Sequence, residues 1–408
     1  MTDAVMAAGI ALLAMAAAGA DDAEPGLLRH SQDWVQTRMQ QMLAVDDAYL
    51  WHEVLGGRAI HQNSMTNPPT EPNEGNFHTQ QQAFYASVKM DVYDLGGKEE
   101  TRHLDDARDL LSWVVENGYD QEQRQFYLKY NRRSGEWTKS FHPEFNMMSV
   151  SALLRYDTYR GTPRFVAAAE DVLEHIIETD AFKPDKPKGL YTSGYLALKL
   201  LDAYESTEQE RFLTWARQVT DLANQMMWDS EYGGWLYAGN PEGELPEYTV
   251  KFTHTNANMI QACLRLYLLE QGDQYLKYAT EALEFLAEHS RSPDGGWYRH
   301  NTRDGSDPTQ PPIVGDGATT GTGAVCVYDR MAQVMVACCL AYRATKDARY
   351  LRWIDETLDK MEQTHLTEYA AGVDYGYVNA GDYQNTWCHL WGLKAMIAMT
   401  ELWREFGG

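Results

Sequence analysis

The sequence predicts an all-α fold in which six helical hairpins close into a ring, an (α/α)6 barrel with short glycine-aromatic β-hairpin elements. Two kinds of helical pattern alternate along the chain. One kind is apolar on a single face and is expected on the outside of the fold. The other kind is apolar nearly all round, which is typical of a buried helix. Segments rich in glycine and aromatic residues follow the single-faced helices.

The single-faced helices carry apolar residues three or four positions apart, as in Leu351, Ile354, Leu358 and Met361. Such patterns lie at 31–45, 105–115, 165–176, 212–226, 276–286 and 351–361. They are expected to be six outer helices, each burying one face against the rest of the fold.

The helices that are apolar all round are expected to be the six inner helices. They cover residues 80–93, 145–156, 195–204, 256–269, 330–342 and 387–403. Their starts recur about every 50–70 residues, a spacing that marks stacked helical hairpins. An open stack would expose one face of its end units, so the pattern favours a closed ring. Gly233-Gly234-Trp235 and Gly295-Gly296-Trp297 are expected to form short β-hairpins.

Composition narrows the class of function. The chain of 408 residues has 35 Lys and Arg against 59 Asp and Glu, a net charge of −24 that argues against binding to nucleic acid or to an anionic membrane surface. Aromatic residues make up 12% of the chain, and sugar stacking is one use for so many. Five cysteines without a CxxC motif indicate neither a disulfide framework nor a zinc site. No metal ion and no cofactor are expected.

The N-terminus has the pattern of a secretory signal. Residues 1–20 are rich in Ala and Gly and end in Ala18-Gly19-Ala20, which has the small-x-small form of a cleavage site, although Met1-Thr2-Asp3 carries no positive charge. We therefore expect a signal peptide at 1–20 and a single catalytic domain over 26–408. The expected location is secreted or periplasmic, with the cytoplasm as the alternative.

The hairpin units resemble a known superfamily. Asn256-Ala257-Asn258 with Gly272-Asp273 and Gly295-Gly296-Trp297-Tyr298, and Ala341-Tyr342 with the segment 346–351, look like units of the six-hairpin glycosidases. Within that superfamily the chain is most similar to N-acylglucosamine 2-epimerase-like and toroid mannanase-like proteins, over roughly 80–408. The resemblance implies a toroid enzyme that acts on an oligo- or polysaccharide or on a free sugar.

In such a ring the starts of the inner helices converge on one mouth, and polar residues cluster at these starts. Four of the twelve His lie there. The candidate catalytic residues are Glu144, Asp329, His254, His389 and His142. The candidate substrate-binding residues are His78, Gln81, Asn146, Tyr195, Asn256, Asn258, Arg330, Asn385, Trp387 and Trp235, and further polar residues at these starts are Gln80, Gln82 and Gln333.

Several chemistries fit these residues. Glu144 and Asp329 could be the acid and base of a glycoside hydrolase, which is the leading hypothesis. His254 and His389 on opposite sides of a sugar could instead move a proton beside a carbonyl, giving a 2-epimerase or an aldose–ketose isomerase. Amides that neutralise a uronate would give a polysaccharide lyase. A non-catalytic glycan-binding toroid is the remaining alternative.

The resemblance also shows two departures. The adjacent Asp-Asp of the mannanases is not found on an expected inner helix, since Asp46-Asp47 and Asp105-Asp106 lie on or beside expected outer helices. The epimerase pattern of His followed three residues later by Glu is replaced by His254 followed by Ala257. The candidate carboxylates of this chain therefore come from separate inner-helix starts.

Overall fold

The computed structural model describes most of the chain and builds it from helices. The described residues are 28–60, 65–66, 76–161, 163–178, 190–237, 250–307, 326, 328–364, 366–367, 376–377, 383–384 and 386–407. Over these residues the chain forms twelve α-helices and a short π-helical turn at Leu286–Ser290. The predicted signal peptide at 1–20 lies outside the described residues.

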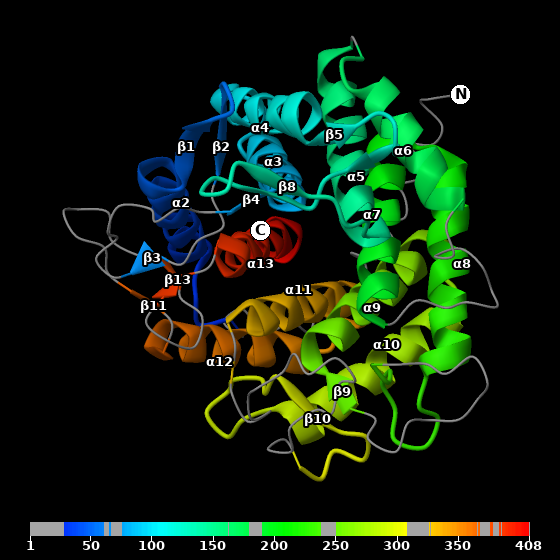
Figure 1. The fold of residues 1–408 in the computed structure, drawn as a ribbon. Coiled ribbons are helices and arrows are strands. Elements are labelled where there is room, and N and C mark those ends of the chain that lie inside the picture. Colours follow the sequence, from blue (N-terminus) through cyan, green and yellow to red (C-terminus); the bar gives the residue numbers. More distant parts are fainter. Residues whose placement is uncertain are drawn as a thin grey trace.

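Six helices form an inner ring (Figure 1). They are α3 (Thr79–Leu95), α5 (Pro143–Arg160), α7 (Leu190–Thr207), α9 (Thr253–Glu270), α11 (Tyr328–Thr345) and α13 (Thr386–Phe406). Each packs against the next one along the chain, and α13 packs against α3. The ring is therefore closed, as the sequence predicts.

Six helices form the outer layer. They are α2 (Gln32–Tyr49), α4 (Arg102–Gly118), α6 (Val166–Glu178), α8 (Glu210–Met227), α10 (Asp273–Phe285) and α12 (Arg349–Thr364). Five of them pack on the inner helix that precedes them, whereas α2 packs on α13. One hairpin thus joins the first described helix to the last, and the ring is completed by contacts between the two ends of the chain.

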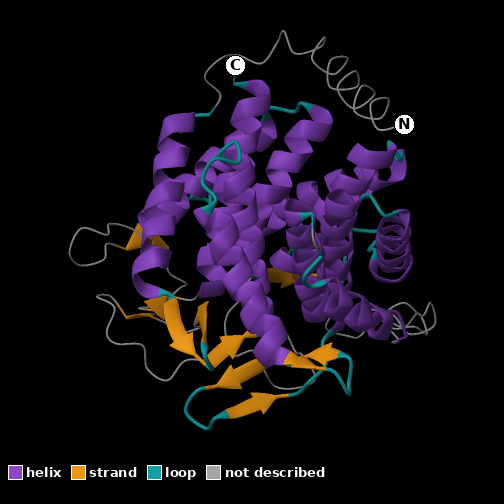
Figure 2. Cartoon of the chain, turned by 90° about the horizontal axis from the view of Figure 1, so that it is seen from above, coloured by secondary structure: helices purple, strands orange, loops and turns teal. Residues whose placement is uncertain are grey.

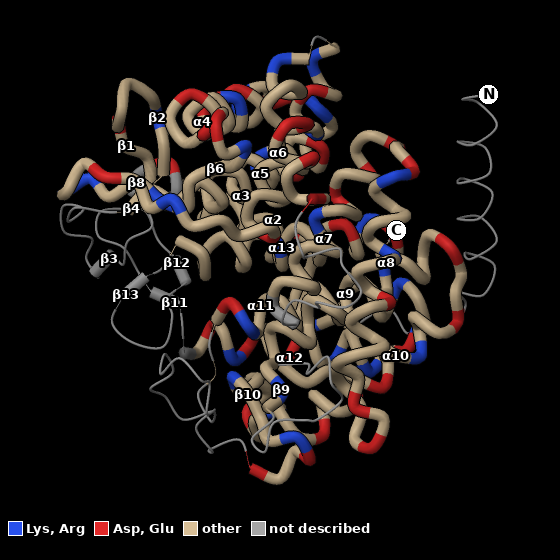
Figure 3. The backbone as a smooth tube through the Cα atoms, turned by 45° about the vertical axis from the view of Figure 1, so that its right-hand side comes forward, with Lys and Arg blue, Asp and Glu red and all other residues tan. Residues whose placement is uncertain are grey.

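The two layers follow from the two helical patterns. The inner helix α9 buries nearly every residue from Thr253 to Leu264. The outer helix α4 buries a stripe that includes Leu110, Leu111 and Val114 and leaves its charged residues outside. Figure 3 shows acidic and basic residues interspersed along the outer helices. Among the described residues, no helix is both long and apolar enough to cross a membrane.

Short antiparallel strands gather at one end of the ring, as Figure 2 shows. They pair as β1 (Trp51–Val54) with β2 (Gly57–Ile60), β4 (Asn76–His78) with β7 (Lys129–Asn131) and β8 (Glu136–Thr138), β5 (Tyr119–Asp120) with β6 (Gln125–Phe126), β9 (Val250–Phe252) with β10 (His300–Thr302), β3 (Met65–Thr66) with β13 (Tyr383–Gln384), and β11 (Leu366–Thr367) with β12 (Gly376–Tyr377). Strand β4 runs directly into α3, and β9 runs directly into α9. The strands therefore mark the end at which inner helices begin, which we call the mouth. The opposite end, where α13 finishes, is the far end.

Candidate active site at the mouth of the ring

A repeated amide contact fixes the rotation of three inner helices. In the first turn, Gln82, Asn146 and Asn256 each accept a hydrogen bond from a backbone N–H of an earlier segment, at 2.8, 2.6 and 2.7 Å. Each also donates to the carbonyl of the residue four positions before it, which directly precedes its helix. Gln82 and Asn256 donate in addition to the carbonyl of the same earlier residue, at 2.6 and 2.9 Å. We call these three residues the amide clamps.

The amide clamps point away from the axis of the ring, so the opposite helix face points toward it. At 3.6 residues per turn, positions two before and two after a clamp lie on that opposite face. These positions are Gln80 and Phe84 on α3, Glu144 and Met148 on α5, and His254 and Asn258 on α9. The ring of Phe84 lies 5.2 Å from those of Trp387 and Trp391 on the neighbouring helix α13. Nζ of Lys199 on α7, a helix that is not adjacent to α3 in the ring, lies 5.4 Å from the Phe84 ring, so this face looks inward.

Several buried oxygen atoms in the first two turns of the inner helices have no hydrogen-bond partner among the described residues. They are Gln80 Oε1, Gln81 Oε1, Glu144 Oε2, Asp329 Oδ1 and Gln333 Oε1. Buried polar atoms in folded proteins nearly always have a partner, so such a group of oxygens marks a place where a ligand or water completes the bonding. Buried amide donors without a partner, Gln333 Nε2 and Asn258 Nδ2, lie on the same set of helices, so the ligand that suits this group carries hydroxyls, which both donate and accept.

Glu144 is the first carboxylate of the site. It follows Pro143 in the first turn of α5, and only 3% of its surface is exposed. Its Oε1 atom lies 3.6 Å from Nδ1 of His142, which leaves Oε2 as the unpartnered oxygen. The interaction with the Glu144 carboxylate raises the pKa of His142 above its ordinary value and outweighs the opposing effect of partial burial.

Asp329 is the second carboxylate. It lies in the first turn of α11, is fully buried, and forms an ion pair with Arg330 through Oδ2. In the closed order of inner helices, α11 stands opposite α5. Packed helices are about 8–10 Å apart, so opposite helices of a ring of six are about 16–20 Å apart. Carboxylates that reach inward from the two opposite helices can therefore approach a sugar from two sides.

Two histidines at the mouth are held neutral. Burial lowers the pKa of His254 well below its ordinary value, and the charges of Arg330 and Arg299 add to the effect. Burial, with a smaller contribution from Lys129, lowers the pKa of His78 to about 3. Both imidazoles are therefore uncharged near neutral pH, which makes them possible bases or hydrogen-bond partners.

Aromatic side chains line the axis below these residues. The ring of Tyr195 on α7 lies 6.0 Å from Trp387 and 6.3 Å from Trp391 on α13, the helix opposite. Burial raises the pKa of the Tyr195 hydroxyl, and the nearby charge of Asp329 raises it further. Phe84, Tyr195 and Trp391 are buried and Trp387 is half-buried. Trp387 is thus the aromatic face of this group that is nearest to solvent.

The structure does not bring every predicted residue to this place. Nε2 of His389 lies 3.2 Å from the carbonyl oxygen of Met42 on α2, away from the axis. Trp235 is buried against the outer helices, where its Nε1 donates to Asn224 Oδ1 at 3.0 Å. The predicted residue Asn385 lies outside the described residues. Of the remaining predicted residues, Asn146 and Asn256 are amide clamps, and their side chains form hydrogen bonds with backbone groups.

Sequence reasoning missed two of the axis-facing aromatic residues. Phe84 lies four residues after Gln80, and Trp391 four residues after Trp387. A residue four positions on shares the same helix face, so this spacing could have identified both of them once one axis-facing residue was known.

No metal centre is assembled in the part of the chain that the structure describes. It contains no group of three or more His, Cys, Asp or Glu side chains placed to hold an ion. All five cysteines are free thiols, and burial raises the pKa of Cys338 and Cys339, so neither is disposed to bind metal as a thiolate.

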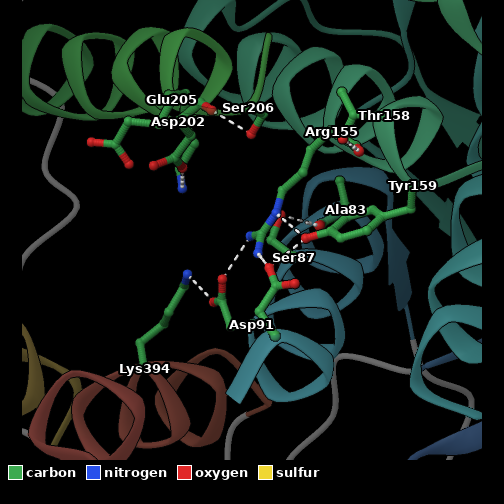
Figure 4. Close-up of polar contacts among 12 residues, drawn as sticks. Ala83, Ser87, Asp91, Arg155, Thr158, Tyr159, Asp202, Glu205, Ser206 and Lys394 are labelled. Carbon is green, nitrogen blue, oxygen red and sulfur yellow. Dashed lines mark hydrogen bonds and ion pairs between the residues drawn. The ribbon is translucent and has the colours of Figure 1, made fainter. Parts of the chain in front are cut away.

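The far end of the ring holds a cavity of about 590 Å³ lined by all six inner helices. Its polar groups are paired with one another (Figure 4). Arg155 donates to Asp91 at 2.6 Å and to Asp94 at 2.9 Å, while Lys394 also pairs with Asp91. Burial tends to raise the pKa of Asp91, but the charges of Lys394 and Arg155 outweigh it and lower the pKa.

A second network completes the far end. Asp202 accepts from Lys199 at 2.6 Å and from Arg265 at 2.8 Å, and Arg265 also pairs with Glu205. The carboxylates and cations on this side therefore satisfy each other. The mouth, with its unpartnered oxygens, is the stronger candidate for the place where a substrate binds.

Solved structures with the same architecture include both epimerases and hydrolases. A sugar epimerase from a ruminal bacterium matches with a TM-score of 0.72 at 12% identity, covering 90% of this chain and 98% of that one. Cellobiose 2-epimerase from Bacillus thermoamylovorans matches with 0.71 at 12% identity, covering 90% and 99%. An α-1,6-mannanase from Salegentibacter sp. matches with 0.59 at 16% identity, covering 91% and 99%. At these identities the structural matches establish the fold.

A match to a family model goes further than the structural matches. No curated protein sequence matches the chain. The family model described as glycosyl hydrolase family 76 matches residues 147–373, which is more than half of the chain. This range includes Asp329 and starts three residues after Glu144. The chain therefore belongs to glycosyl hydrolase family 76 and is a glycoside hydrolase.

Proposed function

We propose that this protein hydrolyses neutral α-linked oligo- or polysaccharides, with α-1,6-mannan as the first candidate, and that Glu144 and Asp329 at the mouth are its catalytic carboxylates. The observation that carries the proposal is the placement of these two buried carboxylates on opposite inner helices, each with one unpartnered oxygen. Glycoside hydrolysis needs such a pair on the two sides of the scissile bond.

The surroundings of the two carboxylates suggest their roles. Asp329 is paired with the guanidinium of Arg330, which suits a carboxylate that acts as base or nucleophile. Glu144 has no Arg or Lys partner among the described contacts and lies beside His142. We therefore assign Glu144 as the acid that protonates the leaving oxygen and Asp329 as the ionised partner.

The unpartnered acceptors support a neutral sugar as the substrate. Gln80, Gln81 and Gln333 each offer a buried amide oxygen that a sugar hydroxyl can satisfy. A uronate would instead place its carboxylate beside Glu144 and Asp329, where like charges repel. The half-buried Trp387 adds an aromatic face on which a sugar ring can stack.

The mannanase relative supports the candidate substrate and shows how this chain differs. A variant of the Salegentibacter enzyme in which two adjacent aspartates are replaced by asparagines is described as inactive and as bound to α-1,6-mannotriose. In the present chain the adjacent pairs Asp46-Asp47 and Asp105-Asp106 lie on the outer helices α2 and α4. A carboxylate pair at the mouth must therefore come from two different helices here.

A proton NMR time course in D2O tests this proposal. The panel contains α-1,6-mannan, other neutral glycans, uronate glycans and free aldoses. We expect new reducing-end signals from a neutral glycan, and a loss of rate of about 10³-fold in Glu144→Gln and in Asp329→Asn. Glu401→Gln at the far end is the matched control and should keep the wild-type rate. Wild-type cleavage by Glu144→Gln and Asp329→Asn would refute the assignment.

The same experiment examines sugar epimerisation, the second candidate. It is favoured by the neutral imidazole of His254 near the axis. A two-histidine mechanism is disfavoured, because His389 contacts the Met42 carbonyl on α2. Deuterium uptake beside the carbonyl of a free aldose, abolished by His254→Ala, would establish this activity in place of hydrolysis.

We also propose that the protein is exported, because a polysaccharide substrate would be met outside the cell. The alanine-rich pattern of residues 1–20 supports this proposal. Amino-terminal sequencing of the protein recovered from its native host would show cleavage after Ala20. A chain that keeps Met1 inside the cell would refute export.

A further inference from the structure

Glu144 is nearly inaccessible to water, yet a general acid must hold a proton each time a substrate arrives. Only 3% of the residue is exposed, and Oε2 has no hydrogen-bond partner among the described residues. The other oxygen, Oε1, is turned toward the imidazole of His142, 3.6 Å away. The side chain of His142 is 40% exposed, so this imidazole touches both the buried carboxyl and solvent.

The position of the imidazole is fixed by its neighbours. The ring of Phe145 lies 5.3 Å from that of His142. The backbone carbonyl of His142 accepts hydrogen bonds from the backbone N–H and the side-chain amide of Asn146. His142 is thus held at the first turn of α5 by a ring contact and an amide clamp, and a small rotation of either side chain brings Nδ1 and Oε1 within hydrogen-bond distance.

The electrostatic surroundings of His142 and Glu144 favour an interaction between these two groups. In the described part of the chain, Glu144 is the one charged group that acts on the His142 imidazole. On the neighbouring helix α6, His175 packs on the ring of Phe141 at 4.7 Å. The four carboxylates of α6 are paired with arginines, three with Arg124 and one with Arg211. Within the described part of the chain, these carboxylates therefore do not compete for the proton that His142 and Glu144 can share.

We propose that His142 is a positioning residue for Glu144, which orients the carboxyl group and exchanges a proton with it through Oε1. The inference rests on the proposed role of Glu144 as the acid. When the proton moves from Nδ1 to Oε1, His142 becomes neutral and Glu144 becomes a neutral acid, so charge and protons balance within the pair. A half-turn of the carboxyl group then brings the protonated oxygen toward the substrate, and water supplies the next proton to the pair.

The shared proton predicts a particular pH dependence. A coupled pair loses its protons in two steps that belong to the pair. The pKa of His142 is raised, so the pair keeps its last proton to a higher pH than a lone carboxyl would. The alkaline limb of the pH profile of kcat should therefore depend on His142, whereas KM should not.

Two substitutions distinguish the role of His142 in orienting Glu144 from its role as a titrating group. His142→Phe keeps an aromatic ring against Phe145 but removes Nδ1, and we expect kcat to fall about 10- to 100-fold at unchanged KM, with the alkaline limb moved to lower pH. His142→Asn places an amide near the position of Nδ1 but cannot titrate. It should restore most of kcat while its alkaline limb stays at the lower pH. His175→Phe is the matched control and should keep the wild-type profile.

The outcomes distinguish this inference from the proposed function. If Glu144→Gln keeps full activity, the proposed function fails, and the role of His142 fails with it. If Glu144→Gln is inactive but His142→Phe has the wild-type kcat and pH profile, only the role of His142 is refuted. If His142→Phe loses activity and His142→Asn restores neither kcat nor thermal stability, the residue is structural, and the inference is again refuted.

Discussion

The two ends of the ring are built from the same six helices but treat their buried polar groups in opposite ways. At the far end, Asp91 and Asp202 each contact two cations, and the surrounding carboxylates and cations form networks. At the mouth, Glu144 and Asp329 each keep an unpartnered oxygen. The free energy of unfolding gains nothing from such oxygens, so their presence indicates that this end is arranged for a ligand rather than for stability.

The largest expected difference lies in activity. Glu144→Gln and Asp329→Asn should each lower kcat by about 10³-fold, since each removes a proton-transfer or charge role from the reaction. Thermal unfolding of Glu144→Gln should occur at the wild-type temperature or above it, because a buried carboxyl with an unpartnered oxygen is lost. A large loss of stability in Glu144→Gln would contradict the division between the two ends.

The converse change at the far end should act on stability. Asp91→Asn leaves Lys394 and Arg155 without their shared carboxylate, and breaking a buried ion pair in this way costs about 3 kcal/mol of the free energy of unfolding. Urea unfolding measures this loss. The kcat of the folded variant should stay within about twofold of wild type. A drop in kcat as large as that of Glu144→Gln would show that the two ends are not separable.

The amide clamps provide a sharper comparison within the mouth itself. Asn256→Ala removes the hydrogen bonds to the backbone of Trp235 and Phe252 and should cost about 2 kcal/mol of the free energy of unfolding. Asn258, two residues later, lies on the axis-facing side. Asn258→Ala should have a smaller effect on stability and raise KM instead. Equal effects of the two substitutions on KM would contradict the assigned rotation of α9.

The smallest effect near neutral pH comes from the protonation of His78. The pKa of His78 is lowered to about 3 by burial, against about 6.5 for an unfolded chain. The unfolded state therefore binds the extra proton first, so stability is full above pH 6.5 and falls as the pH drops toward 3. Each such group removes about 1.4 kcal/mol per pH unit in that range. The free energy of unfolding of His78→Gln, measured with urea between pH 7 and pH 5, should decline less than that of wild type. An identical decline would exclude His78 as a source of the pH dependence.

The fold could be predicted because its signal is repeated. The stripe of Leu351, Ile354 and Leu358 shows an outer helix, and the all-round apolar run of 256–269 shows an inner one. Six repetitions of this alternation leave a closed ring as the natural arrangement. The prediction needed only helix faces and their order, both of which the sequence contains.

The site was predicted less completely, because a helix start does not reveal which of its residues turns inward. Successive residues point about 100° apart, so His389 lies on the opposite face from Trp387, although only one residue separates them. Asn256 likewise looked like a substrate ligand, but its amide binds backbone groups. The rotation of each helix depends on contacts with earlier segments, which have no local signature in the sequence.

The most direct test of this account is a crystal structure of Glu144→Gln with α-1,6-mannotriose. We expect the sugar at the mouth between α5 and α11, with hydroxyl groups donating to Gln80, Asp329 and Gln333 and one ring stacked on Trp387. The far-end cavity should hold no sugar. Mannotriose bound among Asp91, Arg155 and Lys394, with the mouth unoccupied by sugar, would contradict the central claim that the unpartnered oxygens mark the substrate site.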